Sequence, residues 1–98
     1  MGGNGKTPFV IWLVNTLKRS GFKPGVISRG YKSTSKKFPL HIDSNTDVYH
    51  SGDEAKIISN STNCPVVVGP KRVNSAKYLL DNFDCDVLIT DDGLQHYS

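Results

Sequence analysis

The chain has 98 residues, enough for one domain at most and for only a modest core. Its apolar content of 37% is that of a globular protein, and its longest apolar run, residues 9–14, is far shorter than the roughly 18 residues of a membrane span. The net charge of +3 is uneven: residues 1–40 hold eight Lys and Arg and no acid, and residues 41–98 hold four bases and nine acids. The basic half indicates an anionic ligand such as a nucleotide, a phospholipid or nucleic acid, or equally a solvated surface.

Residues 2–7, Gly-Gly-Asn-Gly-Lys-Thr, match the end of the phosphate-binding pattern G-x-x-x-x-G-K-[ST]. The first glycine of that pattern would precede Met1, and so would the buried strand that normally leads into such a loop. We therefore expect residues 1–98 to be a partial phosphate-loop (P-loop) domain, cut inside its own motif and lacking its first strand.

The residue types in this segment suit a nucleotide. Gly2, Gly3 and Gly5 can adopt positive φ and turn several N–H groups toward one anion at the start of a helix. Lys6 can reach the β- and γ-phosphates, and Thr7 can place its hydroxyl on Mg²⁺. The alternative is a glycine-rich turn that only caps the helix.

The remaining chain predicts alternating helices and strands. Residues 7–20 form a helix with a wide apolar face, Pro8 in its first turn and Gly21 as its C-cap. The elements expected after it are strand 26–28, a possible edge strand 38–42, helix 53–59, strand 65–68, helix 70–82 and strand 86–90. This alternation predicts an α/β fold: a parallel sheet of at most three or four strands with flanking helices.

Polar residues follow three of these strands: Arg29-Gly30-Tyr31, Lys71-Arg72 and Asp91-Asp92. Ligands bind beyond the carboxyl ends of strands in such sheets. Asp91 and Asp92 follow an apolar strand, as the metal-site acids of a P-loop enzyme do, although Asp92-Gly93 also suits a surface turn.

Ser51 and Glu54 fit a helix capping box, and from the residues alone this interpretation is favoured over Asp53 as a general base. His96 is more typical of a loop, and no zinc pattern exists. Cys64 and Cys85 form no C-x-x-C motif, which predicts reduced, partly buried thiols in a cytosolic protein.

Taken together, the motifs resemble those of the tetraacyldisaccharide 4′-kinase family of lipid A biosynthesis. The segments that carry the resemblance are residues 2–8, Ser28-Arg29-Gly30-Tyr31, Gly52-Asp53-Glu54 and residues 90–96 (Thr-Asp-Asp-Gly-Leu-Gln-His). The resemblance covers the whole chain, which would be about a third of such a kinase. It implies transfer of the γ-phosphoryl group of ATP, with Mg²⁺, to the 4′-hydroxyl of an acylated glucosamine disaccharide 1-phosphate.

The resemblance also assigns roles to residues. Asp53 becomes the catalytic base, paired in the family with a histidine beyond Ser98, and Lys6 acts on the phosphates. The ATP-binding residues are Gly2, Gly3, Asn4, Gly5, Lys6 and Thr7; the metal-site residues are Thr7, Asp91 and Asp92; candidates for substrate contact are Arg29, Tyr31, Glu54, Arg72, Gln95 and His96. Ala55 departs from the proline that the family usually has after Gly-Asp-Glu.

Two other functions stay open at this point. A partition-type ATPase switch also carries G-G-x-G-K-T, but with a signature lysine where Met1 stands; a non-enzymatic remnant is the third hypothesis. For the kinase we expect ATP and the acylated lipid as partners, no nucleic acid, and work at the cytoplasmic face of the inner membrane. The 98 residues alone we expect to be cytoplasmic and inactive.

Overall fold

The structure is a computed structural model that describes the backbone of residues 3–28, 40–42, 53–90 and 93–96, and the side chains of residues 7–28, 41–42 and 55–90. Its helices are α1 (Gly3–Arg19), α3 (Asp53–Thr62) and α4 (Arg72–Asn82). Its strands are β1 (Pro24–Ser28), β2 (Leu40–Ile42), β3 (Val66–Val68), β4 (Val87–Thr90) and β5 (Gly93–His96).

The strands form one five-stranded sheet in the order β2-β3-β1-β4-β5. The three central strands are parallel, with Val26 beside Val66 on one side and beside Ile89 on the other. Both edge strands are antiparallel to their neighbours, β2 to β3 and β5 to β4. The prediction of an edge strand ending at Ile42 is confirmed. The predicted α/β fold with a parallel sheet is confirmed in its three central strands, but the sheet has five strands and not three or four, because β5 is added.

Strand β5 was the missed element. Its sequence, Gly-Leu-Gln-His, contains a glycine and no β-branched residue, so its composition carries no strand signal. Its partner supplies the strand geometry, because Thr90 pairs with Gly93 and Val87 with His96 along the edge of β4. His96 therefore lies in a strand and not in the loop that its sequence predicted.

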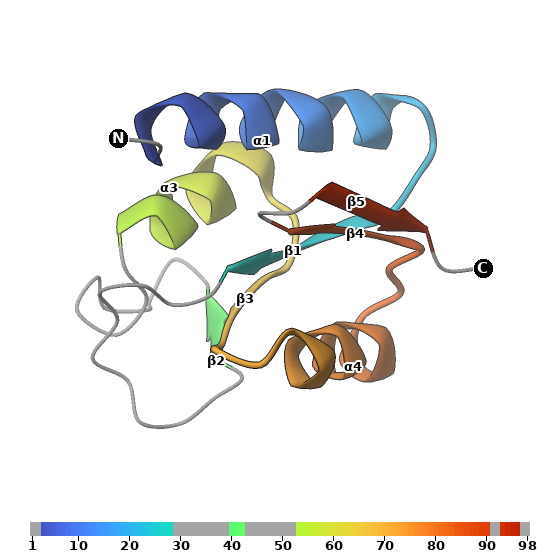
Figure 1. Cartoon of the computed structure of the whole chain (residues 1–98). Helices are drawn as coiled ribbons and strands as arrows, with labels where there is room; N and C mark the ends of the chain where they lie inside the picture. The colour runs from blue at the N-terminus through green and yellow to red at the C-terminus, as the bar shows by residue number, and fades with distance from the viewer. Residues whose placement is uncertain (1–2, 29–39, 43–52, 91–92, 97–98) are drawn as a thin grey trace.

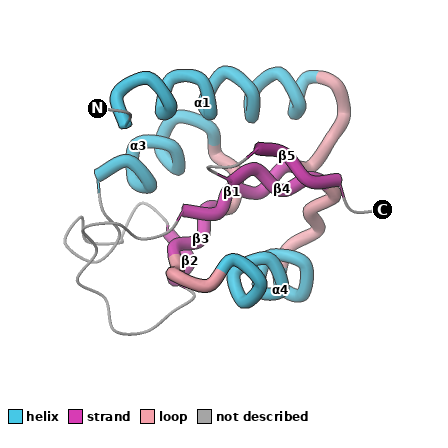
Figure 2. The backbone as a smooth tube through the Cα atoms, in the orientation of Figure 1, coloured by secondary structure: helices cyan, strands magenta, loops and turns pink. Residues whose placement is uncertain are grey.

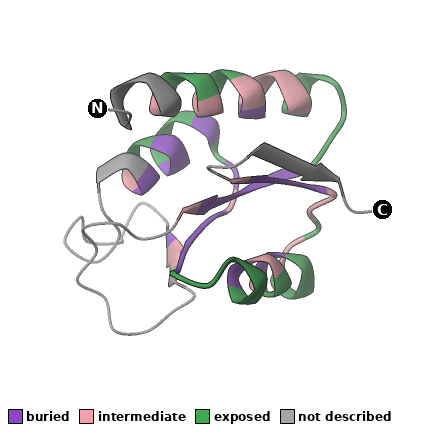
Figure 3. Ribbon diagram, in the orientation of Figure 1, coloured by how far each residue is buried: buried purple, intermediate pink, exposed green. Residues whose placement is uncertain are grey.

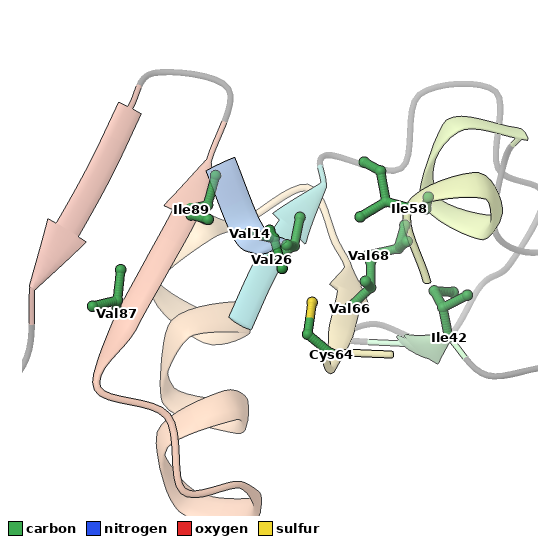
Figure 4. Close-up of a cluster of buried hydrophobic side chains, with 10 residues drawn as sticks. Val14, Val26, Ile42, Ile58, Cys64, Val66, Val68, Val87 and Ile89 are labelled. Atoms are coloured by element: carbon green, nitrogen blue, oxygen red, sulfur yellow. The ribbon is translucent and has the colours of Figure 1, made fainter. Parts of the chain in front are cut away.

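The molecule has three layers: α1 and α3 cover one face of the sheet and α4 covers the other (Figures 1 and 2). Strand side chains alternate between the two faces. Those on the α1/α3 side pack with Val14 and Ile58 into one buried cluster, which Figure 4 shows around Val26, Val66 and Ile89. This cluster is the larger of the two cores.

The second core lies between the sheet and α4. Ile27, Val67 and Leu88 point to this face and pack against Leu79, which is fully buried. Figure 3 shows the result: the central strands are buried, and α1 and α4 expose their outer sides. None of the described helices combines the length and the hydrophobicity needed to cross a membrane.

Helix boundaries differ most at the N-terminus. The expected glycine-rich turn before residue 7 is instead the first part of α1, which begins at Gly3 and includes Pro8. Once the apolar face of a helix is anchored, each further residue adds a hydrogen bond, so the helix extends backward. Pro8 weakens that extension, because it has no N–H to donate to the carbonyl of Asn4, four residues earlier. Among glycines of the described backbone, positive φ occurs at Gly21, the predicted C-cap.

The other boundaries moved by one to three residues. Helix α3 runs to Thr62 instead of residue 59, and α4 begins at Arg72 instead of residue 70. Strand β1 starts earlier, at Pro24, because its backbone pairs with β4 from Val87 onward. The predicted cap residue Ser51 lies outside the described residues.

Candidate functional site

The candidate site lies at the edge of the sheet where the three parallel strands end. These strands finish at Ser28, Val68 and Thr90, and Ser28 is level with Val68. The N–H of Gly69 donates to the carbonyl of Ser28 at 2.8 Å, which joins the ends of β1 and β3. The predicted motifs after Ser28 and Thr90 therefore leave the sheet at one common edge, as ligand-binding segments of α/β proteins do.

The helices also begin at this edge. Because α1 leads into β1 and α3 leads into β3, each helix runs opposite to its strand and starts where that strand ends (Figure 1). Helix α4 starts at the same edge, three residues after Gly69. The start of a helix carries unpaired N–H groups and a partial positive charge, both favourable for an anion. The topology thus brings together the start of α1, with Lys6, and the start of α3, with Asp53.

Each predicted site residue can be placed in one of three groups. Thr7 and Arg72 are described with their side chains. Those described by backbone alone are Gly3, Asn4, Gly5, Lys6, Asp53, Glu54, Gln95 and His96. Those outside the described residues are Gly2, Arg29, Tyr31, Asp91 and Asp92.

Thr7 and Arg72 occupy different surroundings at the edge. Thr7 is half-buried in α1, one turn from the helix start. Arg72 is exposed and is the first residue of α4, after Lys71 in extended conformation. The side chain of Lys71 makes no capping hydrogen bond to α4. Two exposed cations therefore stand where α4 begins, and both favour an anion there.

The residues proposed for magnesium have the right chemistry for it. A threonine hydroxyl and two carboxylates are oxygen donors, which Mg²⁺ prefers. Thr7 lies near the start of α1, and β4 ends at Thr90, directly before Asp91. Elsewhere in the part of the chain with described side chains, no three His, Cys, Asp or Glu residues are grouped to hold a metal ion.

The two thiols lie away from this edge, before the starts of β3 and β4. Both are free, as predicted; Cys64 is buried and Cys85 is half-buried. Burial raises the pKa of Cys64, and it raises the pKa of Cys85 to about 11. Both thiols are therefore protonated at neutral pH, which excludes them as activated nucleophiles.

The fold resembles one solved structure over nearly the whole chain: the apo form of LpxK from Aquifex aeolicus in complex with ATP. The TM-score is 0.80 at 29% sequence identity, and the match covers 93% of this chain and 30% of that one. The fold is therefore that of a P-loop kinase, which agrees with the glycine-rich start of α1 at the carboxyl edge of a largely parallel sheet.

Sequence comparisons give the particular family. The family model of the tetraacyldisaccharide-1-P 4′-kinases, LpxK, matches residues 1–98. The tetraacyldisaccharide 4′-kinase of Coxiella burnetii (strain RSA 493 / Nine Mile phase I) is 54% identical over 98 residues, covering 100% of this chain and 30% of that protein. That of Haemophilus influenzae (strain 86-028NP) is 52% identical over 97 residues, covering 99% of this chain and 29% of that protein. The chain belongs to the tetraacyldisaccharide 4′-kinase family and spans about 30% of the length of these relatives.

Proposed function

We propose that this chain supplies the ATP-binding part of a lipid kinase, which phosphorylates the 4′-hydroxyl of a tetraacylated glucosamine disaccharide 1-phosphate in lipid A biosynthesis. The observation that carries the proposal is the family match over all 98 residues. The solved relative with this fold is described in complex with ATP. The fold adds a physical reason, because it brings the glycine-rich start of α1 to the carboxyl edge of the sheet.

ATP is the donor in this proposal. Backbone N–H groups of Gly3 to Lys6, the first four of α1 and so without an acceptor four residues earlier in the helix, bind its phosphates where the helix dipole favours negative charge. Lys6 neutralises charge on the β- and γ-phosphates as the γ-phosphoryl group moves. Arg72, at the start of α4 on the same edge, is placed to contact a further anionic group of the nucleotide or the lipid.

Mg²⁺, held by the hydroxyl of Thr7 and the carboxylates of Asp91 and Asp92, would offset the phosphate charge. Asp53 accepts the proton of the sugar 4′-hydroxyl, and the 4′-oxygen forms a bond to the γ-phosphorus. The bond from that phosphorus to the β,γ-bridging oxygen breaks, and ADP leaves. Glu54 supports Asp53 from the same first turn of α3.

The lipid acceptor determines where in the cell the complete kinase acts. A tetraacylated disaccharide resides in a bilayer, so the complete kinase acts at a membrane surface, which we propose is the cytoplasmic face of the inner membrane. Arg29 and Tyr31, which come directly after β1 in the sequence, are our candidates for contact with the acceptor. Gln95 and His96, the other candidates from the sequence, pair with Leu88 and Val87 toward the amino end of β4, so the fold does not bring them to the carboxyl edge.

A chimaera tests the proposal. The matched segment of the Coxiella burnetii kinase is replaced by residues 1–98, and transfer of ³²P from ATP to the acylated disaccharide is measured. We expect activity, and a loss of about 10²- to 10⁴-fold in turnover for Asp53→Ala with little change in ATP affinity. Lys6→Ala should lower both the turnover and the affinity for ATP.

The melting temperature separates catalysis from capping. If Asp53→Ala lowered only the melting temperature of the chimaera and left turnover intact, Asp53 would be a cap and not the base. An inactive but folded chimaera would support a non-enzymatic remnant and refute the proposal.

The isolated chain should behave differently from the chimaera. It spans about 30% of its relatives, and phosphoryl transfer depends on groups held to within about half an ångström by the structure around them. We expect no 4′-kinase activity and weak or no Mg-ATP binding by titration calorimetry. Micromolar binding that Lys6→Ala abolishes would contradict this expectation.

A further inference from the structure

Helix α1 is more apolar than its place over the sheet requires. Its apolar residues are Phe9, Val10, Ile11, Trp12, Leu13, Val14 and Leu17. Val14 is fully buried in the larger core, and Val10, Ile11, Leu13 and Leu17 are partly buried against it. A helix that is apolar on nearly all sides is typical of the interior of a larger protein.

Two aromatic residues extend this apolar surface into solvent. Phe9 and Trp12 are each 57% exposed, and their ring centroids lie 5.9 Å apart. Aromatic rings of this kind contribute strongly to protein interfaces, and lone exposed residues are less informative than neighbouring ones. We call the surface formed by Phe9, Trp12 and the adjoining edge of Leu13 the outer flank of α1.

The outer flank faces away from α3. Lys18, one of the last residues of α1, reaches α3 and donates to the carbonyl of Thr62 at 2.7 Å. Phe9 lies nine residues earlier, which is about two and a half helical turns, so it projects from the side opposite Lys18. Trp12 and Leu13 lie on either side of that direction. Phe9 and Leu13 therefore lie on the β4–β5 side of α1, whereas Trp12, about 160° around the helix from buried Val14, points away from the sheet.

The sheet has room for another helix on that side. A helix is about 10 Å wide and strands are about 4.8 Å apart, so one helix covers roughly two strands. Helix α3 packs on β2 and β3, and α1 packs on β1. Val14 of α1 also shares its cluster with Val87 and Ile89 of β4. Within the described residues, β5 packs closely against β4 and has no extensive contact with α1.

We propose that the outer flank of α1 is the docking surface for a helix from the part of a complete tetraacyldisaccharide 4′-kinase that lies outside the 98 matched residues. The match covers only 30% of the Coxiella burnetii relative, so most of that protein lies outside it. That remainder is joined covalently to the matched segment and so is present at high effective concentration. The docked helix presents an apolar face to Phe9 and Trp12. The inference rests on family membership and not on the reaction.

Thiol labelling tests this directly. Trp12→Cys is introduced into the isolated chain and into the Coxiella burnetii chimaera, and the rate of maleimide labelling is followed by mass spectrometry. Because the native thiols Cys64 and Cys85 have raised pKa values, they react slowly. Val73→Cys is the matched control, since Val73 is 78% exposed on α4, across the sheet. We expect the thiol introduced by Trp12→Cys to react at least tenfold more slowly in the chimaera, and the thiol of the control variant to differ much less between the two.

Thermal unfolding gives a second measurement. The double variant Phe9→Glu/Trp12→Glu should lower the melting temperature of the chimaera by about 6–10 °C, because it buries two carboxylates in place of two rings. The same change should shift the isolated chain by less than about 2 °C, because the rings are exposed there.

Three outcomes would overturn the proposal. One is equal labelling of the Trp12→Cys thiol in the chimaera and in the isolated chain. Another is protection of that thiol in the isolated chain that increases with protein concentration, which would make a second copy the partner. The third is protection in the chimaera that appears only with anionic phospholipid vesicles, which would make the partner a membrane surface.

Discussion

The two ends of the parallel strands are built differently. At the amino end, backbone and side-chain bonds close the structure: Lys23 N–H donates to Asp86 Oδ1 at 2.8 Å, and Asp86 N–H donates to the carbonyl of Lys23 at 3.0 Å. At the carboxyl end, the bond of Gly69 N–H to Ser28 ties two strands, and Lys71 does not cap α4 with its side chain.

Helix ends differ in the same way. At the amino end, α3 finishes with Asn63 in the left-handed region, at φ 55°, and Lys18 donates to the last-turn carbonyl of Thr62. At the carboxyl end, all three described helices begin, and exposed Lys71 and Arg72 lie beside α4. The comparison teaches that the described contacts that close the structure gather at the amino end and in the core, whereas the helix starts gather at the carboxyl end. Substitutions at the amino end should therefore alter stability and not nucleotide binding.

The largest effect at the amino end is expected for Gly25→Ala. A Cβ at this position of β1 would lie 2.9 Å from Cys85 Sγ, 3.2 Å from Leu79 Cδ1 and 3.3 Å from Leu88 Cδ2. Such overpacking costs about 1–3 kcal/mol, measured as the free energy of unfolding in urea. Adding Cys85→Ala should restore part of the lost free energy of unfolding, because it removes the Sγ atom nearest to the added Cβ.

Gly21→Ala is the matched control for that experiment. Gly21 has φ +94° and nothing within 4 Å of an added Cβ, so alanine there is strained by its backbone alone. Cys85→Ala should not relieve that loss. If it restored both variants equally, close packing around Gly25 would not be the cause.

A smaller effect is expected for Lys18→Met. The substitution keeps most of the side-chain stem but removes the ammonium that donates to Thr62 at the end of α3. The loss should be about 1 kcal/mol, because a cation at a helix C-terminus is stabilising. Arg19→Met is the control: Arg19 contacts Thr16 Oγ1 at 3.4 Å on the surface, and its removal should change little. If Lys18→Met and Arg19→Met lowered the free energy of unfolding equally, the effect would come from the loss of a positive charge and not from the hydrogen bond to Thr62.

Alkaline pH should weaken the amino end through Cys85. Burial raises its pKa from 9.0 to about 11, so the unfolded chain loses the thiol proton first as pH increases. The stability from the neutral thiol is complete below about pH 9 and is lost as the pH rises through about 11. Cys85→Ala should flatten the melting temperature over this interval relative to the wild type. An unchanged slope would contradict this role of Cys85.

The smallest effect is expected for Asp84→Asn. Lys23 Nζ and Asp84 Oδ2 are 2.8 Å apart, but their side chains are 63% and 92% exposed. The hydrogen bond between them lowers the pKa of Asp84 and raises that of Lys23, and water screens such a pair. Any stability from the lowered pKa is present above the ordinary carboxyl pKa and is lost as pH falls through the folded value. We expect no measurable change in melting temperature at neutral pH; a clear decrease would show that this surface pair matters.

Local sequence predicted most of the fold because the signals were strong. The β-branched run Val66–Val68 favours a buried strand, because its side chains need apolar surroundings on both faces of a sheet. The apolar stretch of α1 favours a helix with one face packed on the core. The same reasoning located the edge strand at Ile42. It missed β5, whose strand conformation depends on pairing with β4. It also placed the start of α1 four residues too late, because the helix continues on the N-terminal side of Pro8 as far as Gly3.

For the candidate site, the sequence was sufficient to indicate the family and to propose the role of each residue. The motifs that carry this prediction are the glycine-rich segment with Lys6 and Thr7 and the carboxylates of Asp53, Asp91 and Asp92. Each is a particular residue type at a particular spacing, and their order along the chain is that of the family. Only the tertiary structure decided that α1, α3 and α4 all begin at one edge, and that Phe9 and Trp12 remain exposed. Those facts follow from strand order and helix direction, which long-range pairing sets and no local pattern encodes.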